Sequence, residues 1–190
     1  MLLRFLCMLS LSLCWWVSHS QVHFIENSGQ WPSEVEMMSE VPGGRMWFLK
    51  TGVRYEMFSP ETFQNFHPSN PKEHSDIFQS HVFDVRWHNG RSKDIEKNKP
   101  EPSKRNYYLG QNQVAKVSSY DQFEQKNIYP QIDLRWRGVG HAIKYEWVIQ
   151  PGGEPQQVVQ QYAQDVKIKL EDGELIVQSN TGTFLEKAPF

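Results

Sequence analysis

Four histidines recur at intervals of seven residues, and they are the first side chains whose type and spacing could support chemistry: His67, His74, His81 and His88. Neutral imidazole is a common ligand of Zn²⁺, so such a series raises the question of a metal site. A helix would align the four rings, but Pro68 and Pro71 interrupt the first interval, and residues 81–87 alternate as a strand does. We therefore expect solvent-facing histidines in a loop and at strand ends, and we predict neither a metal centre nor a cofactor. A weak transition-metal site formed by these histidines is the alternative.

Asp133 and Glu146 lie on neighbouring apolar runs, where adjacent strands could bring their carboxylates together. Glycoside hydrolases use paired carboxylates, one as general acid and the other as nucleophile or base. The same two runs also carry Arg135, Arg137 and Lys144, so ion pairing across the strands is the simpler interpretation. Because the sequence also lacks a nucleophile-elbow pattern and a glycine-rich phosphate loop, we predict that the protein is not an enzyme.

Aromatic side chains are the remaining candidates for ligand contact, because exposed aromatic faces are common in binding surfaces. Most of the tryptophans and tyrosines fall at alternating positions of predicted strands, where the core is the usual destination. Trp31 and Tyr129 instead stand beside Pro32 and Pro130 in turns, which makes them the better surface candidates. These two are our ligand-binding candidates, although packing beneath the turn is the more common role of aromatic residues in such positions.

The first 20 residues have the layout of a secretory signal peptide. One positive charge, Arg4, precedes an apolar run over residues 5–17, and Ser18-His19-Ser20 places small residues where a signal peptidase reads them. The apolar run is about 13 residues long, whereas a membrane span needs about 20. We therefore expect a cleaved leader, a mature chain from Gln21 without a membrane span, and a secreted protein in the extracellular space or on the outer-membrane surface.

Composition narrows the class of protein further. Both cysteines, Cys7 and Cys14, lie in the predicted leader, so we expect a mature domain without disulfides or cysteine-bound metal. The chain has 20 Lys and Arg against 22 Asp and Glu, interspersed, which leaves no basic field for nucleic acid. Residues 21–190 suit a single domain. The chain ends on Ala188-Pro189-Phe190 without a polar tail, so we expect a fragment of a longer protein.

Alternating apolar residues predict short strands joined by tight turns. The clearest pair covers residues 132–137 and 143–149, which glycines separate. Further hairpins are predicted around Thr51-Gly52 and Asp172-Gly173. Beside Thr51-Gly52 we expect four side chains to face inward: Trp47, Leu49, Val53 and Tyr55.

Two polar, proline-containing segments, residues 59–79 and 92–105, are predicted to be surface loops, because their composition does not suit a core element. The remaining signals amount to about ten short strands with frequent turns and little or no helix. This pattern predicts an all-β fold, an antiparallel β-sandwich.

Six phrases along the chain resemble one family. They occupy residues 24–32, 42–45, 106–110, 127–134, 144–152 and 186–189, and read FIENSGQWP, PGGR, NYYLG, NIYPQIDL, KYEWVIQPG and EKAP. In this order they are similar to the uncharacterised N-terminal domain of large secreted proteins of Bacteroidota. In such proteins that domain often precedes SBBP (β-propeller-type) repeats, polycystic-kidney-disease-like modules and a gliding-motility-associated C-terminal sorting domain. The chain departs from the family's usual pattern at Gln131, where glycine is usual, and at Arg135-Trp136, where two tyrosines are usual.

The resemblance implies a surface location among other domains, and it transfers no catalytic residue. We therefore predict a non-catalytic structural or adhesion module, the N-terminal part of a multidomain bacterial surface protein. Its partners would be neighbouring domains of the same polypeptide and a glycan or protein ligand. The first alternative is a carbohydrate-binding module, which predicts an exposed planar row of aromatic rings. The second is an accessory domain of a glycan-active hydrolase or lyase, which predicts a cleft with convergent carboxylates or histidines.

Overall fold

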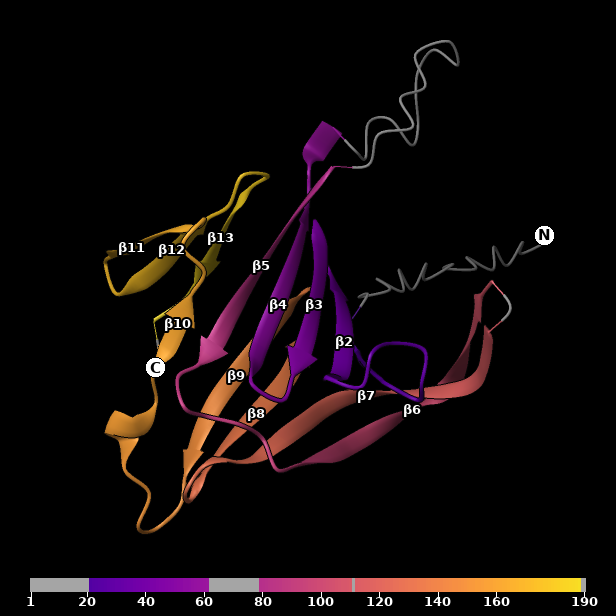
Figure 1. Ribbon diagram of the computed structural model, residues 1–190, viewed down its shortest axis with the longest axis horizontal. Coiled ribbons are helices and arrows are strands. Elements are labelled where there is room, and N and C mark those ends of the chain that lie inside the picture. The colour runs from indigo at the N-terminus through magenta and orange to yellow at the C-terminus, as the bar shows by residue number, and fades with distance from the viewer. Residues whose placement is uncertain (1–20, 62–78, 111, 189–190) are drawn as a thin grey trace, which may run out of the picture.

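The computed structural model describes residues 21–61, 79–110 and 112–188, and over these residues the chain is built of antiparallel strands (Figure 1). The predicted leader, most of the predicted 59–79 loop, and both His67 and His74 lie outside the described residues. The thirteen strands are β1 (Phe24–Glu26), β2 (Val35–Val41), β3 (Gly44–Leu49), β4 (Gly52–Phe58), β5 (Ser80–Trp87), β6 (Asp94–Leu109), β7 (Asn112–Tyr129), β8 (Ile132–Val139), β9 (Ala142–Ile149), β10 (Gln160–Tyr162), β11 (Lys167–Glu171), β12 (Glu174–Gln178) and β13 (Thr183–Glu186). A short 3-10 helix, η2 (Pro155–Gln157), precedes β10. Within the described residues, no helix has the length and apolar character needed to cross a membrane.

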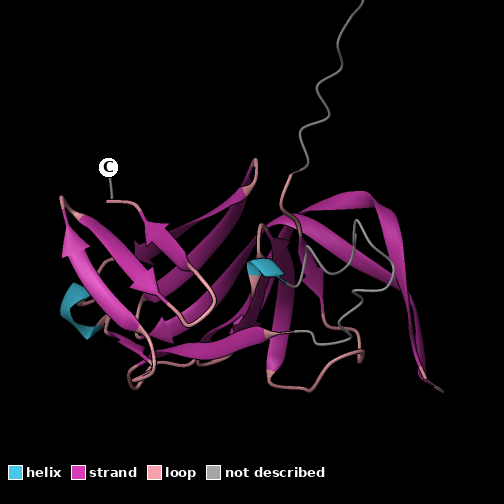
Figure 2. Ribbon diagram, turned by 90° about the horizontal axis from the view of Figure 1, so that it is seen from above, coloured by secondary structure: helices cyan, strands magenta, loops and turns pink. Residues whose placement is uncertain are grey.

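Ten strands form one large sheet in the order β10-β5-β4-β3-β2-β1-β7-β8-β9, with β6 alongside β7. The other three form a small sheet, β11-β12-β13, which lies beside β10 and β5 (Figure 1). Val177 and Phe184 of the small sheet pack against the same core as Phe83 of β5. The predicted all-β fold with packed antiparallel sheets and little helix is therefore confirmed, and the large sheet is curled into a half-barrel (Figure 2).

The first three strands are apolar on both faces. Phe24 of β1, Met37 of β2 and Phe48 of β3 are fully buried in the main core, on the inner face of the curled sheet. Each of these residues has a sequence neighbour that points to the outer face. These neighbours are Ile25, Met38 and Trp47, and they belong to a second apolar cluster. Since side chains alternate along a strand, these runs bury apolar groups on two sides of one sheet.

The β3–β4 hairpin forms as predicted, but its turn lies one residue earlier than the Thr51-Gly52 pair. Leu49 pairs with Gly52, so the loop is Lys50-Thr51. Across this two-residue loop Phe48 pairs with Val53, and Met46 pairs with Tyr55. Because successive side chains of a strand point to opposite faces, Met46 and Phe48, not Trp47 and Leu49, share the inner face with Val53 and Tyr55.

The predicted 92–105 loop was wrong, because the 16-residue strand β6 begins at Asp94 and covers the rest of it. β6 pairs only with β7 and therefore lies at an edge, where charged residues and prolines are tolerated. Its register shifts between Pro100 and Lys104, so a bulge interrupts the pairing there. Beyond this bulge, residues 104–110 and 112–118 form the far part of the hairpin, which extends away from the body and which we call the arm (Figure 2).

The other predicted hairpins are confirmed. β8 and β9 are joined by a two-residue loop in which Gly140 has a φ of 58°. β11 and β12 are joined by Asp172-Gly173, with φ values of 50° and 82°. Positive φ at both central residues is the signature of the type I′ turn that matches strand twist.

A third tight turn, Pro130-Gln131, joins β7 to β8, and Gln131 has a φ of 61°. Proline followed by a residue with positive φ is the pattern of a type II turn, which favours glycine at the second position. This gives a physical reason for the glycine that is usual here in the similar family.

We predict that Gln131→Gly raises the free energy of unfolding by about 1 kcal/mol, because glycine removes the strain of a left-handed conformation. Urea denaturation followed by tryptophan fluorescence measures the change. Gln131→Ala is the matched control and should give no gain, because alanine also needs φ > 0 there. An equal gain in both variants would contradict this conformational explanation.

Candidate functional site

Three aromatic rings meet on the outer face of the large sheet and form what we call the aromatic patch: Trp31, Trp47 and Tyr107. The Trp31 ring centroid lies 5.3 Å from that of Trp47 and 5.5 Å from that of Tyr107. All three side chains remain partly exposed, while Ile25, Met38 and Val117 beneath them are buried. The patch therefore combines a fixed apolar base with accessible aromatic surface, the composition found at the centre of protein interfaces.

A hydrogen-bonded loop holds Trp31 in place. The Asn27 side-chain amide donates to the carbonyl oxygens of Pro32 and Val35 at 2.9 Å, and to that of Trp31 at 3.2 Å. Its Oδ1 accepts from the backbone N–H groups of Gly29 and Trp31. Because one side chain satisfies so many backbone groups, the loop is set before any ligand arrives.

Charged groups border the rings. Trp47 Nε1 donates to Glu56 Oε2 at 3.3 Å, and Arg45 pairs with the same carboxylate at 3.5 Å. On the arm, Arg105 lies 3.9 Å from Glu40. An apolar centre with a polar border is suited to binding a surface, and both border pairs are already neutralised within the domain.

The rings are nearly perpendicular to one another. The Trp31 plane makes an angle of 88° with Trp47 and 73° with Tyr107. These edge-to-face contacts are a favoured aromatic geometry and bury part of each ring. The three rings therefore form an uneven surface and not the planar row that the carbohydrate-binding alternative predicts.

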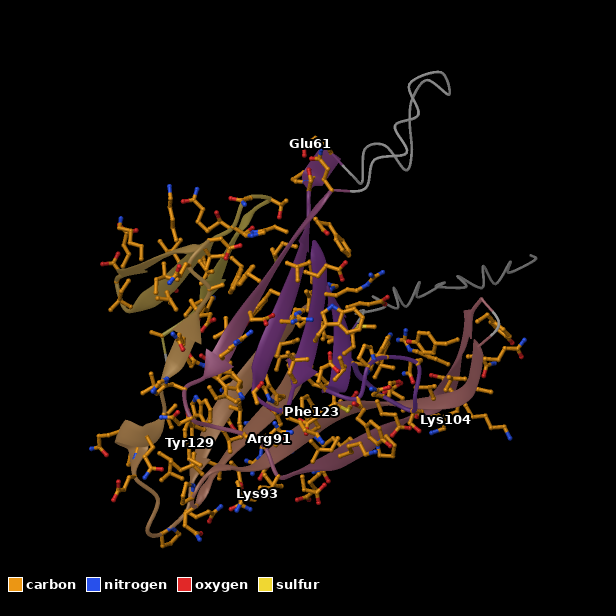
Figure 3. All side chains as sticks on the ribbon, in the orientation of Figure 1. Glu61, Arg91, Lys93, Lys104, Phe123 and Tyr129 are labelled. Atoms are coloured by element: carbon orange, nitrogen blue, oxygen red, sulfur yellow. The ribbon has the colours of Figure 1, made fainter. Side chains whose placement is uncertain are left out.

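Tyr129, the other predicted ligand-binding residue, lies in the core at 5% exposure (Figure 3). Its hydroxyl donates to the carbonyl oxygen of His88 at 3.1 Å, and burial raises the pKa of the phenol. Packing beneath the turn is therefore what the structure shows for Tyr129, which offers no open ring face. Trp31 is packed as well, but it keeps part of its surface accessible.

Of the four spaced histidines, His81 and His88 are described, and they flank β5 at its two ends. A seven-residue separation along a strand corresponds to about 23 Å, too far for a shared metal ion. His81 Nε2 lies 2.8 Å from Asp165, and its Nδ1 accepts from the backbone N–H of Asn180. Both ring nitrogens of His81 are thus already engaged.

Asp133 and Glu146 take part in ion pairs across the strands, as predicted. Asp133 accepts from the backbone N–H of Asn127 at 2.7 Å and pairs with Lys126 at 2.6 Å. These contacts lower the pKa of Asp133, although burial opposes them. Glu146 pairs with Arg137. A general acid needs a raised pKa, so Asp133 has the opposite of the required property.

Comparison with known families decides the classification. A family model described as a domain of unknown function, DUF7948, matches residues 24–190. The chain belongs to the DUF7948 family. No curated protein and no solved structure matches it.

The DUF7948 domain has one further constellation, where the small sheet meets the large one. Glu186 of β13 accepts hydrogen bonds from Tyr145 of β9 at 2.9 Å and from Tyr162 of β10 at 2.7 Å. Burial is the main cause that raises the pKa of both phenols well above the usual value, and the negative charge of Glu186 raises it further. Since β9 and β10 are the two ends of the large sheet, one carboxylate joins both ends to the small sheet.

Sequence reasoning found one residue of the aromatic patch and missed two. Trp47 was predicted to share the inner face with Val53 and Tyr55, whereas the pairing of Phe48 with Val53 places it on the outer face. Tyr107 was recognised only as part of an extended phrase, and its position depends on β6, of which residues 94–105 were predicted as a loop. The run of apolar residues on both faces of β3 was the available signal, since a one-sided strand does not place Trp47 between Met46 and Phe48.

Proposed function

We propose that this DUF7948 domain is a non-catalytic adhesion or docking module, which contacts its partner through the aromatic patch. One observation carries the proposal: three rings, held from three segments, stay partly exposed over a buried apolar base. Aromatic side chains positioned in this way are the residues that dominate binding energy at interfaces. The paired state of Asp133 and Glu146 supports the non-catalytic part of the proposal.

We further propose that the domain acts outside the cell, as the N-terminal part of a multidomain bacterial surface protein. The signal-like first 20 residues and the resemblance to domains that precede SBBP repeats in Bacteroidota support this location. Neighbouring domains of the same polypeptide, or a protein on another surface, are then the expected partners. The perpendicular rings favour such a protein partner over a flat glycan chain.

We predict that Trp31→Ala weakens attachment at least tenfold, since loss of a central aromatic residue typically costs 2 kcal/mol or more. The measurement is retention of the fluorescently labelled chain on intact bacterial cells, before and after protease treatment of the cells. Tyr108→Ala is the matched control, because Tyr108 is 71% exposed and lies outside the patch. Attachment that Trp31→Ala leaves unchanged would contradict the role of the patch.

A glycan array distinguishes the carbohydrate-binding alternative, to which the partly exposed Trp31 gives some support. The proposal expects protease-sensitive attachment to cells and no signal on the array. An array signal that disappears in Trp31→Ala would replace the proposed protein partner with a glycan.

A further inference from the structure

Three side chains of the kinds that bind transition metals converge at the base of the arm: His23, Glu101 and Asp121. His23 Nδ1 lies 2.9 Å from Asp121 Oδ1 and 3.6 Å from Glu101 Oε1. One ligand atom from each residue lies within 4.8 Å of the other two. Ligands of a tetrahedral zinc ion, each about 2 Å from the metal, are about 3.3 Å apart. The three atoms thus stand near the spacing that one ion requires.

The sheet itself places two of the three residues. Phe24 pairs with Tyr120 between β1 and β7, and extending this register by one residue sets His23 opposite Asp121. The backbone around His23 is held on both sides, since Val22 N–H donates to the Gly140 carbonyl at 2.9 Å. The His23 carbonyl accepts from Ser39 Oγ at 2.8 Å. The histidine and the aspartate are therefore positioned without the help of a metal.

Glu101 comes from the bulge of β6, where the register with β7 is interrupted. A bulge redirects side chains, and here it turns a carboxylate toward the other two ligands. The arm begins just past this bulge, at Lys104 (Figure 3). A bound ion would thus join the start of the arm to the segment before β1.

The local charge favours a cation. Throughout the described residues, the ion pairs of Glu101 and Asp121 lead to His23 alone, and neither carboxylate pairs with a lysine or arginine. The two carboxylates together carry two negative charges, which is more than a protonated His23 could neutralise. A divalent ion would neutralise both, and it would use the imidazole as a neutral ligand.

We propose that His23, Glu101 and Asp121 bind a divalent transition-metal ion such as Zn²⁺. One imidazole nitrogen and two carboxylate oxygens form a mixed set that suits Zn²⁺, and they leave coordination positions for water. Neither the predicted histidine series nor the aromatic patch contributes to this site. The ion fixes the direction in which the arm leaves the body.

The test is zinc binding by the purified chain, stripped with a chelator and titrated with Zn²⁺ against a chromophoric competitor. We expect one ion per chain, and at least tenfold weaker binding in His23→Gln, Asp121→Asn and Glu101→Gln. Asp165→Asn is the matched control, because it replaces the same carboxylate by an amide beside a second histidine, His81, for which the described part of the chain supplies no third ligand. Its zinc affinity should equal that of the unaltered chain.

Circular dichroism and the midpoint of thermal unfolding show whether each variant is folded. If His23→Gln fails to fold, Glu101→Gln carries the test, since Glu101 lies in an edge-strand bulge. The proposal is overturned if the unaltered chain retains no stoichiometric Zn²⁺, or if the three variants bind as tightly as Asp165→Asn. It is also overturned if His81→Gln or His88→Gln removes the binding while His23→Gln does not.

Discussion

Glu186→Ala should lower the free energy of unfolding by about 3 kcal/mol and the melting midpoint by about 10 °C, because two partly buried phenols lose a charged acceptor at once. Glu186 Oε2 accepts from Tyr145 and Oε1 from Tyr162, so the alanine leaves both hydroxyls without this partner. The effect is larger than for an ordinary hydrogen bond, since one carboxylate accepts from both phenols. Chemical denaturation followed by tryptophan fluorescence measures it.

Two variants make this expectation specific. Glu171→Ala removes an exposed carboxylate of the same sheet, paired with Lys169 at 3.1 Å, and should change stability by less than about 0.5 kcal/mol. Glu186→Gln keeps one acceptor and one donor, and should fall between the two alanine variants. Equal midpoints for Glu186→Ala and Glu171→Ala would show that the two hydrogen bonds to Glu186 do not stabilise the domain.

The raised pKa values of Tyr145 and Tyr162 give the same contact a signature in alkali. The unfolded chain releases phenolic protons near pH 10, whereas the folded chain holds them to higher pH. Stability is therefore unaffected below about pH 10 and decreases above it. The part of the tyrosinate absorbance that comes from Tyr145 and Tyr162 should rise only when β9 and β10 separate from Glu186.

Local signals in the sequence were sufficient for the hairpins. Asp172-Gly173 and Gly140 define turns whose backbone needs are met by residue type alone, and the strands beside them alternate clearly. Residues 94–105 were beyond such reasoning, because a strand at an edge is held by backbone pairing to β7 and needs no apolar pattern. Composition therefore predicted solvent exposure correctly and secondary structure incorrectly.

In the candidate sites, too, local sequence identified single residues but not the contacts that depend on strand pairing. Trp31 was found because a turn and a proline identify it locally. Its contacts with Trp47 and Tyr107 depend on register and on the path of β6, which no local pattern encodes. His23 and Asp121 are 98 residues apart and share no motif spacing, so only pairing between β1 and β7 reveals them.

Glu36, a buried carboxylate of the large sheet, is the site of the second substitution for which we expect a large change in stability. Glu36 is 9% exposed, and its two oxygens accept from neutral donors, Ser92 Oγ and Gln125 Nε2, both at 2.7 Å. Gln125 also donates to the Leu49 carbonyl and accepts from Trp136 Nε1. Burial raises the pKa of Glu36, and the two hydrogen bonds only partly oppose this. The ionised form is thus less favourable in the folded chain than in water.

Glu36→Gln should therefore stabilise the domain at pH 7 by about 1–2 kcal/mol, since an amide fills the same space and can donate to Ser92 without carrying charge. The sign of the pH dependence follows from the raised pKa of Glu36. The unfolded chain loses the proton first, so the contribution of Glu36 to stability is complete below about pH 4.3 and is lost as pH rises through the folded pKa. The advantage of Glu36→Gln over the unaltered chain should accordingly grow from pH 4 to pH 7, as measured by urea denaturation at each pH.

Glu36→Ala separates charge from hydrogen bonding. It removes the same carboxylate but leaves Ser92 Oγ without its acceptor and opens a space beside Gln125, at a cost of about 2–3 kcal/mol. If Glu36→Gln were as unstable as Glu36→Ala at pH 7, the carboxylate would have to be ionised and favourable where it lies. If the glutamine variant alone gains stability, loss of the cost of ionising a buried carboxylate explains its gain. The lost hydrogen bonds and the space then explain why alanine, which removes the same charge, gives no gain.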